Sequence, residues 1–134
     1  MALKVLLDTN AFSDLARGES RLAARVRSAD AVILSSIVVG ELLGGFRRGT
    51  RYRENLADLE RFLALPRVQL LYVTLVTAER YGRLYAALRS RGKPIPTNDM
   101  WIAAHAMESG AELLSSDPHF QFVEGLAWTD SREA

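Results

Sequence analysis

The chain has 134 residues, of which 49% are hydrophobic and 25% charged, and this length and composition predict one globular domain over residues 1–134. It contains no cysteine, which excludes disulfide bonds and thiolate metal sites, and it has no apolar run long enough for a membrane span or a signal peptide. We therefore expect a cytoplasmic protein with no membrane association, while the net charge of +1 by itself predicts no partner.

Short apolar runs alternate with helical patterns along the chain. Strands are predicted at 3–7, 31–34, 68–73, 112–115 and 126–129. Helices are predicted from Asn10 to Gly18, over 20–28, from Ser35 or Ser36 to about Phe46, over 51–65, around 78–88 up to Gly92, and from Thr97 to Gly110. Asn10 and Thr97 are the expected N-caps of the first and last helices. This alternation predicts an α/β fold, with a small, mostly parallel β-sheet flanked by α-helices on both faces.

Four acidic residues follow predicted strands or begin the helices after them: Asp8, Glu41, Asp99 and Asp117. Because the carboxyl ends of parallel strands form the ligand crevice of an open α/β sheet, we expect these acids to converge there. Two like charges about 4 Å apart repel by roughly 4 kcal/mol at an effective dielectric of 20, so the acids must raise each other's pKa or bind a cation. Carboxylate oxygens are the ligands that Mg²⁺ and Mn²⁺ prefer. The pattern predicts a metal-dependent phosphodiesterase.

Each acid taken alone has an ordinary structural explanation. Asp8 and Asp117 suit turns, and Asp99 would be stabilised by the dipole of its helix. Asn10, however, is available as the helix cap beside Asp8. Glu41 lies among apolar residues and is expected to face inward, where an unpaired carboxylate would be costly and a cation would compensate it. The repetition of acids at four such places, rather than any one of them, carries the prediction.

The two histidines and Trp101 are expected to have structural roles. His105 and Trp101 lie on a predicted helix beside apolar residues, so they are expected to pack in the core, and His119 is expected in a surface turn. With two separated histidines and no cysteine, we expect no zinc site. The chain also lacks a glycine-rich phosphate-binding motif, so we expect no nucleotide cofactor.

Basic residues form two clusters along the chain. Guanidinium groups suit bidentate contact with phosphates, which favours a phosphate-bearing ligand. Cations also favour the C-terminal ends of helices, so both clusters could equally be solvated helix ends. The first cluster is Arg47, Arg48, Arg51 and Arg53, and the second is Arg89, Arg91 and Lys93.

Four segments, in this order and spacing, resemble the PIN-domain ribonucleases, specifically the VapC-type toxins of type II toxin–antitoxin systems. The segments are Leu6-Leu7-Asp8-Thr9-Asn10, Ser36 to Leu42 around Glu41, Asn98-Asp99-Met100-Trp101-Ile102-Ala103-Ala104, and Leu114-Ser115-Ser116-Asp117-Pro118-His119-Phe120. The resemblance covers nearly the whole chain. One departure is Ser115, which stands where the family usually has threonine and retains the hydroxyl group.

The resemblance implies an endoribonuclease that hydrolyses RNA phosphodiester bonds with Mg²⁺ or Mn²⁺, and a homodimer that a cognate antitoxin silences. It implies that the catalytic and metal-binding residues are Asp8, Glu41, Asp99 and Asp117, with Thr9, Asn10, Ser36 and Ser115 as orienting groups. Apolar residues in 51–65 and at Tyr81, Leu84, Tyr85 and Leu88 also favour a two-fold homodimer.

Other functions remain compatible with the same acids. A housekeeping RNA-processing or DNA nuclease on this fold would use identical chemistry, and a PIN fold could serve as a binding module. A receiver-like signalling domain also holds Mg²⁺ in an acidic pocket, but it usually has paired acids after its first strand, where this chain has only Asp8. A haloacid-dehalogenase-like phosphatase needs Asp-x-Asp, whereas residue 10 is asparagine.

Overall fold

The computed structural model describes residues 3–133, so the ends of the predicted domain, residues 1, 2 and 134, lie outside the described part. Its strands are β1 (Lys4–Leu7), β2 (Ala31–Ser35), β3 (Val68–Leu71), β4 (Glu112–Ser115) and β5 (Trp128–Asp130). Its helices are α1 (Thr9–Ala16), α2 (Ser20–Ser28), α3 (Ser36–Arg48), α4 (Tyr52–Leu63), α5 (Leu75–Ser90) and α6 (Thr97–Ser109), followed by the short 3₁₀ helix η1 (Pro118–Phe122).

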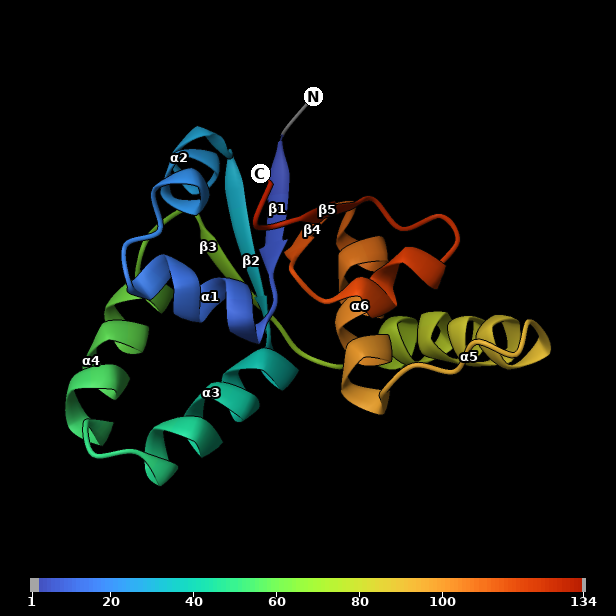
Figure 1. The fold of residues 1–134 in the computed structure, drawn as a ribbon, viewed down its shortest axis with the longest axis horizontal. Coiled ribbons are helices and arrows are strands. Elements are labelled where there is room, and N and C mark those ends of the chain that lie inside the picture. The colour runs from blue at the N-terminus through green and yellow to red at the C-terminus, as the bar shows by residue number, and fades with distance from the viewer. Residues whose placement is uncertain (1–2, 134) are drawn as a thin grey trace.

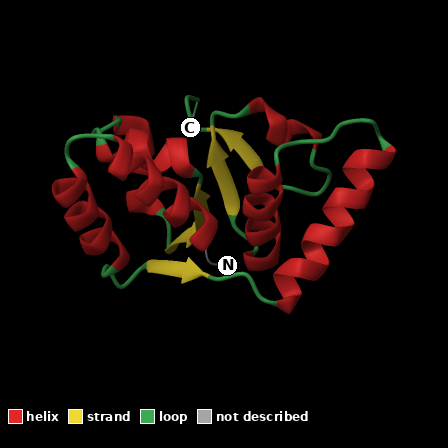
Figure 2. Cartoon of the chain, turned by 90° about the horizontal axis from the view of Figure 1, so that it is seen from below, coloured by secondary structure: helices red, strands yellow, loops and turns green. Residues whose placement is uncertain are grey.

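The five strands form one sheet in the order β3-β2-β1-β4-β5, and every pair in it is parallel. Figure 1 shows helices α1 to α4 on one side of the sheet and α5 and α6 on the other. Seen from below in Figure 2, the strands lie between these two groups of helices. The predicted α/β fold with helices on both faces is confirmed.

The centre of the sheet is the core of the protein. Leu6 of β1 is in register with Ile33 of β2 and Leu113 of β4, and all three side chains are at most 1% exposed. Burying each of them stabilises the fold by about 1.5–3 kcal/mol relative to leaving it exposed. Because the strands are parallel, the segments that follow β1, β2 and β4 all leave from the same edge of the sheet.

The strand order excludes one alternative function. A receiver-like domain has the order 2-1-3-4-5, in which the first strand pairs with the second and third. Here β1 pairs with β2 and β4. The receiver-like interpretation is therefore wrong. Within residues 3–133, no helix is long and apolar enough to cross a membrane.

Two predicted helix caps are also wrong. Helix α1 begins at Thr9 and its N-cap is Asp8, whose Oδ1 accepts a hydrogen bond of 2.9 Å from the backbone N–H of Ala11. Helix α6 begins at Thr97 and its N-cap is Pro96, with no side-chain capping bond. The N-cap lies two residues earlier than expected in α1 and one residue earlier in α6. Asn10 consequently lies in the first turn of α1.

His105 links three elements inside the core, as its predicted packing role requires. It is fully buried on α6, with Nδ1 2.7 Å from the Ser35 hydroxyl at the end of β2 and Nε2 3.2 Å from the carbonyl oxygen of Tyr72. Ser35 in turn caps α3 by accepting a hydrogen bond from the backbone N–H of Ile37. The imidazole therefore satisfies polar groups that would otherwise be unpaired in the core.

Replacing this imidazole should destabilise the protein. His105→Leu keeps an apolar side chain of similar size but leaves the Ser35 hydroxyl and the Tyr72 carbonyl without their partner, which should cost about 1–3 kcal/mol of unfolding free energy. Urea denaturation measures the loss. Ser109→Ala on the same helix removes a bond to a helical carbonyl only, and should change stability by less than about 0.5 kcal/mol. Equal stability of His105→Leu and the wild type would contradict this role.

Candidate active site

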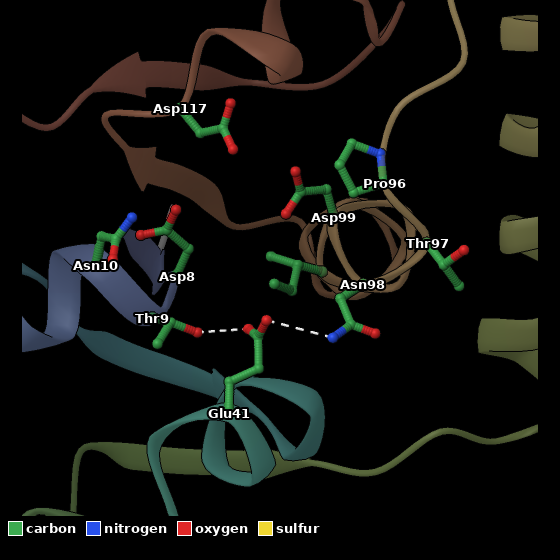
Figure 3. Close-up of a pocket in the computed structure, with 10 residues that line it drawn as sticks. Asp8, Thr9, Asn10, Glu41, Pro96, Thr97, Asn98, Asp99 and Asp117 are labelled. Atoms are coloured by element: carbon green, nitrogen blue, oxygen red, sulfur yellow. Dashed lines mark hydrogen bonds between the residues drawn. The ribbon is translucent and has the colours of Figure 1, made fainter. Parts of the chain in front are cut away.

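A pocket of about 580 Å³ opens at the edge of the sheet where the strands end. Figure 3 shows the carboxylates of its four acidic residues pointing toward one open space. The structure thus brings together the four acids that were predicted as site residues. The pocket is lined by Asp8, Thr9 and Asn10 from the start of α1, Glu41 from α3, residues 96–99 and Ile102 from α6 and the loop before it, and Asp117 after β4.

Asp8 is a buried carboxylate held at both oxygens. Oδ1 caps α1 through the backbone N–H of Ala11, and Oδ2 accepts a hydrogen bond from the hydroxyl of Ser115. Burial raises the pKa of Asp8, these two hydrogen bonds oppose the rise, and the nearby charges of Asp117 and Glu41 add to it. The same residue therefore starts a helix and supplies charge to the pocket, so its capping role does not exclude a functional one.

Ser115 connects two of the acids. Its buried hydroxyl donates to Asp8 and accepts a hydrogen bond of 3.0 Å from the backbone N–H of Asp117. Its place at the end of β4, beside β1, allows both contacts. Ser115 is thus where an orienting group was predicted, whereas Ser36 is not among the described residues that line the pocket.

Glu41 differs from the inward-facing residue expected from the sequence. It is exposed, and its side chain is held at the mouth of the pocket by two hydrogen bonds, drawn as dashed lines in Figure 3. Oε1 accepts a hydrogen bond of 2.6 Å from the hydroxyl of Thr9, and Oε2 accepts one of 3.2 Å from the side-chain amide nitrogen of Asn98. Glu41 therefore needs no buried partner, because it faces the open pocket rather than the core. Thr9 and Asn98 fix its position.

His119 lies in an exposed turn, as expected, but its contact with the acidic residues was not predicted. Its side chain is 47% exposed, and Nδ1 lies 2.9 Å from Asp117 Oδ1 and 3.4 Å from Asp99 Oδ2. The cause is local: Asp117 caps η1 by accepting a hydrogen bond from the backbone N–H of His119, which folds position 119 back over position 117. An Asp-Pro-His sequence after a strand is the signal that could have indicated this turn.

Asp99 and Asp117 form the most strongly interacting acidic pair. Burial, together with the charge and hydrogen bonding of Asp117, raises the pKa of Asp99 to about 6, against the lowering effect of His119. The oxygens of both acids and a ring nitrogen of His119 lie within 4.8 Å of one another. Among the described residues that line the pocket there is no lysine or arginine to neutralise them.

These donors fit a divalent cation. The pocket offers carboxylate oxygens, with one imidazole at its edge, and hard cations such as Mg²⁺ and Mn²⁺ prefer oxygen ligands. The raised pKa of Asp99 shows that the pocket favours added positive charge even when that charge is only a proton. A bound cation would relieve the same repulsion more completely than a proton would.

Comparison with known proteins gives consistent matches. The model of the PIN domain family matches residues 5–126. Ribonuclease VapC1 of Haemophilus influenzae is 31% identical over 130 residues, which cover 93% of this chain and 96% of that protein. The tRNA(fMet)-specific endonuclease VapC of Shigella flexneri is 30% identical, over 72% of this chain and 73% of its own length.

Solved structures agree with these matches. The structure of VapBC-1 from nontypeable Haemophilus influenzae superimposes with a TM-score of 0.84 and 30% identity, covering 97% of this chain and 99% of that one. DNA-bound VapBC from Salmonella typhimurium gives a TM-score of 0.85 and 26% identity, covering 96% of this chain and 98% of that one.

Without a divalent ion, the stability of the protein should fall as the pH rises. Because the pKa of Asp99 is raised from 3.8 to about 6, its contribution to stability is complete below about pH 4 and is lost as the pH rises through about 6. Asp99→Asn should remove this dependence and raise the melting temperature in EDTA near pH 7 by roughly 3–6 °C. Replacing the exposed Glu124 with glutamine should leave both the pH dependence and the melting temperature unchanged. A wild-type melting temperature that rises over this pH range would contradict the argument.

Proposed function

Because the chain belongs to the PIN-domain family, we propose that residues 1–134 act as one endoribonuclease domain that hydrolyses RNA phosphodiester bonds with Mg²⁺ or Mn²⁺. The observation that carries the proposal is the convergence of Asp8, Glu41, Asp99 and Asp117 on one pocket. The related proteins named as ribonucleases support the choice of RNA over other phosphodiesters.

Each side chain has a separate task in this proposal. Asp8, Asp99 and Asp117 would hold the metal, since all three line the pocket with buried or partly buried carboxylates, whereas Glu41 is exposed. A bound divalent ion would supply positive charge that stabilises a phosphoryl oxygen and favours deprotonation of water at neutral pH. Glu41, fixed by Thr9 and by Asn98, would serve as a further ligand or would orient the attacking water and accept its proton.

Ser115 and Asn10 would support this arrangement. Ser115 donates to Asp8 and accepts from the backbone of Asp117, so it holds two acids at a constant separation despite their repulsion. Asn10 lines the pocket from the first turn of α1, where its amide can contact the substrate or a bound water.

We further propose that the nuclease is the toxin of a toxin–antitoxin pair acting in the cytoplasm. Several related solved structures are VapBC complexes, which supports a protein partner. The pocket itself suggests how a partner would silence it: an arginine or lysine inserted among Asp8, Asp99 and Asp117 would replace the charge of the metal. A housekeeping RNA-processing nuclease remains the second candidate, since its site would be the same.

Only part of the surface predicted for the homodimer is exposed, including Leu65 and Tyr85. Leu59, Leu84 and Leu88 of the predicted stripes are buried within the chain, so they are not available to a second copy. Large exposed apolar side chains instead gather where β3 leads into α5, and we propose this patch for the two-fold contact. They are Tyr72, Val73, Leu75 and Val76.

RNA cleavage should depend on both the metal and the acids. Cleavage of single-stranded or loop RNA should stop in EDTA and return with Mg²⁺ or Mn²⁺, because the carboxylates alone repel the phosphate. Asp8→Asn and Asp99→Asn should each lower kcat/KM by more than about 100-fold, beyond the ~10–100-fold typical of residues that only orient a metal ligand. Glu124→Gln should keep wild-type activity. Full cleavage in chelator without divalent ions would refute the proposed mechanism.

Expression in bacteria should separate the toxin from the housekeeping nuclease. The wild-type chain alone should arrest growth, and co-expression of the product of an adjacent small gene should restore it. Asp8→Asn should be harmless without that product, since the arrest requires catalysis. If the wild type is harmless and no neighbouring gene product binds it, the toxin proposal fails and the housekeeping nuclease takes its place.

A further inference from the structure

The pocket cannot bind RNA backbone by itself. It is lined by four acids, and none of the described lining residues is a lysine or an arginine. RNA carries a phosphate at every nucleotide, so the nucleotides flanking the cleaved bond would be repelled by these carboxylates. Cations outside the pocket must therefore bind the flanking phosphates, since contacts between cations and phosphates supply most of the sequence-independent affinity for nucleic acids.

The loop that connects α5 to α6 places cations beside the pocket. Its last residue, Pro96, lines the pocket, and Lys93 is only three residues earlier, which is a span of at most about 11 Å. Figure 2 shows this loop passing beside η1 at the top of the view. The segment that leads into the acidic helix α6 therefore also carries basic residues, a short stretch of chain away from the pocket.

Contacts with Phe122 fix two of these cations in place. Arg91 Nη1 donates a 2.9 Å hydrogen bond to the carbonyl oxygen of Phe122, and Lys93 Nζ lies 5.0 Å from the centre of its ring. Phe122 ends η1, whose N-cap is Asp117. The cations thus bridge the two segments that supply Asp99 and Asp117 to the pocket.

A separate hollow of about 120 Å³ lies on the side of α5 and has one lining residue, Thr97, in common with the acidic pocket. It is also lined by Tyr85, Arg89 and Pro94. Tyr85 is 41% exposed; its ring stacks in an offset manner on that of Tyr81, with centroids 6.3 Å apart, and the Arg89 guanidinium lies 4.9 Å from its centre. An exposed aromatic ring beside cations is the arrangement on which unpaired bases stack while their phosphates are neutralised.

Stabilisation of a helix end accounts for Arg89, which lies in the last turn of α5, but not for the other two cations. The side chains of Arg91 and Lys93 lie beyond the end of α5 at Ser90 and contact Phe122. Within residues 3–133, Arg89, Arg91 and Lys93 form no ion pair, whereas Arg83 on the same helix pairs with Glu79 at 3.1 Å. Their charges are free for a ligand.

We propose that single-stranded RNA on one side of the cleaved bond runs over a basic rim formed by Arg89, Arg91 and Lys93, with one base stacked on Tyr85. This inference rests on the proposed ribonuclease function and identifies the surface that carries its substrate. The rim contacts phosphates and a ring face, so it binds RNA without reading its sequence. It raises substrate affinity and leaves the reacting atoms untouched.

The other basic cluster supplies a matched control. Arg47, Arg48 and Arg53 lie around the turn between α3 and α4, which Figure 1 shows far from α5 and α6. There Arg47 is engaged with Tyr52, through a 3.0 Å hydrogen bond to its hydroxyl and a contact of 4.5 Å with its ring. A triple substitution in this cluster removes the same charge as one in the rim but at a distance from the pocket.

The test compares R89Q/R91Q/K93Q with R47Q/R48Q/R53Q for binding of a short fluorescein-labelled single-stranded RNA in EDTA, where no cleavage interferes. The rim variant should bind at least about tenfold more weakly at low salt, and its slope of log Kd against log salt should fall by about 2, since each phosphate contact in a single strand contributes about 0.7. The control variant should stay near the wild type. Tyr85→Leu should weaken binding about fivefold or more, whereas Tyr85→Phe should not.

Kinetics with Mg²⁺ give the second part of the test. The rim variant should raise KM and retain kcat at saturating RNA, because the rim binds the flanking strand and not the reacting phosphate. Equal losses in the two triple variants, or wild-type binding by the rim variant, would overturn the proposal, and unchanged melting temperatures would show that folding is intact. A wild type that binds RNA through the rim but never cleaves it would instead overturn the proposed function alone.

Discussion

Repulsion among four carboxylates is the constraint on which the rest of this structure depends. Parallel strands bring Asp8 and Asp117 to one edge of the sheet, and the second turn of α3 and the first turn of α6 bring Glu41 and Asp99 to the same place. Such a cluster is unfavourable in an isolated chain, as the raised pKa values of Asp8 and Asp99 show. The protein keeps the acids together because the buried core fixes the backbone from which they project.

Hydrogen bonds from neutral groups keep the acids in place without neutralising them. Asp8 accepts from a helix N–H and from Ser115, and Glu41 accepts from Thr9 and Asn98. A lysine or arginine in these positions would stabilise the apo protein further but would occupy the place of the cation. The unneutralised carboxylates therefore both lower the stability of the apo protein and allow the pocket to bind a metal. The cations lie instead on the rim, where Arg91 and Lys93 can attract phosphates.

The sequence predicted the features that depend on strong local patterns. Apolar runs located the strands, glycines such as Gly110 marked helix ends, and the acids at strand ends indicated the pocket. Features set by the start of a turn or helix were missed. The N-cap of α1 is Asp8, two residues before the predicted Asn10, and the 3₁₀ turn after β4 brings His119 into contact with the acidic residues. The exposure of Glu41 could not be predicted, because it depends on the distance between α3 and α6, which sequence periodicity does not contain.

The central claim is that these carboxylates bind a divalent cation, and calorimetric titration of Mn²⁺ into chelator-treated protein tests it most directly. Titrations near pH 6, in two buffers with different ionisation enthalpies, also count the protons released. The account predicts saturable binding with release of a fraction of a proton, since Asp99 with a pKa of about 6 is partly protonated there, and loss of this release in Asp99→Asn. Absence of binding, or identical binding and proton release in Asp99→Asn, would contradict it.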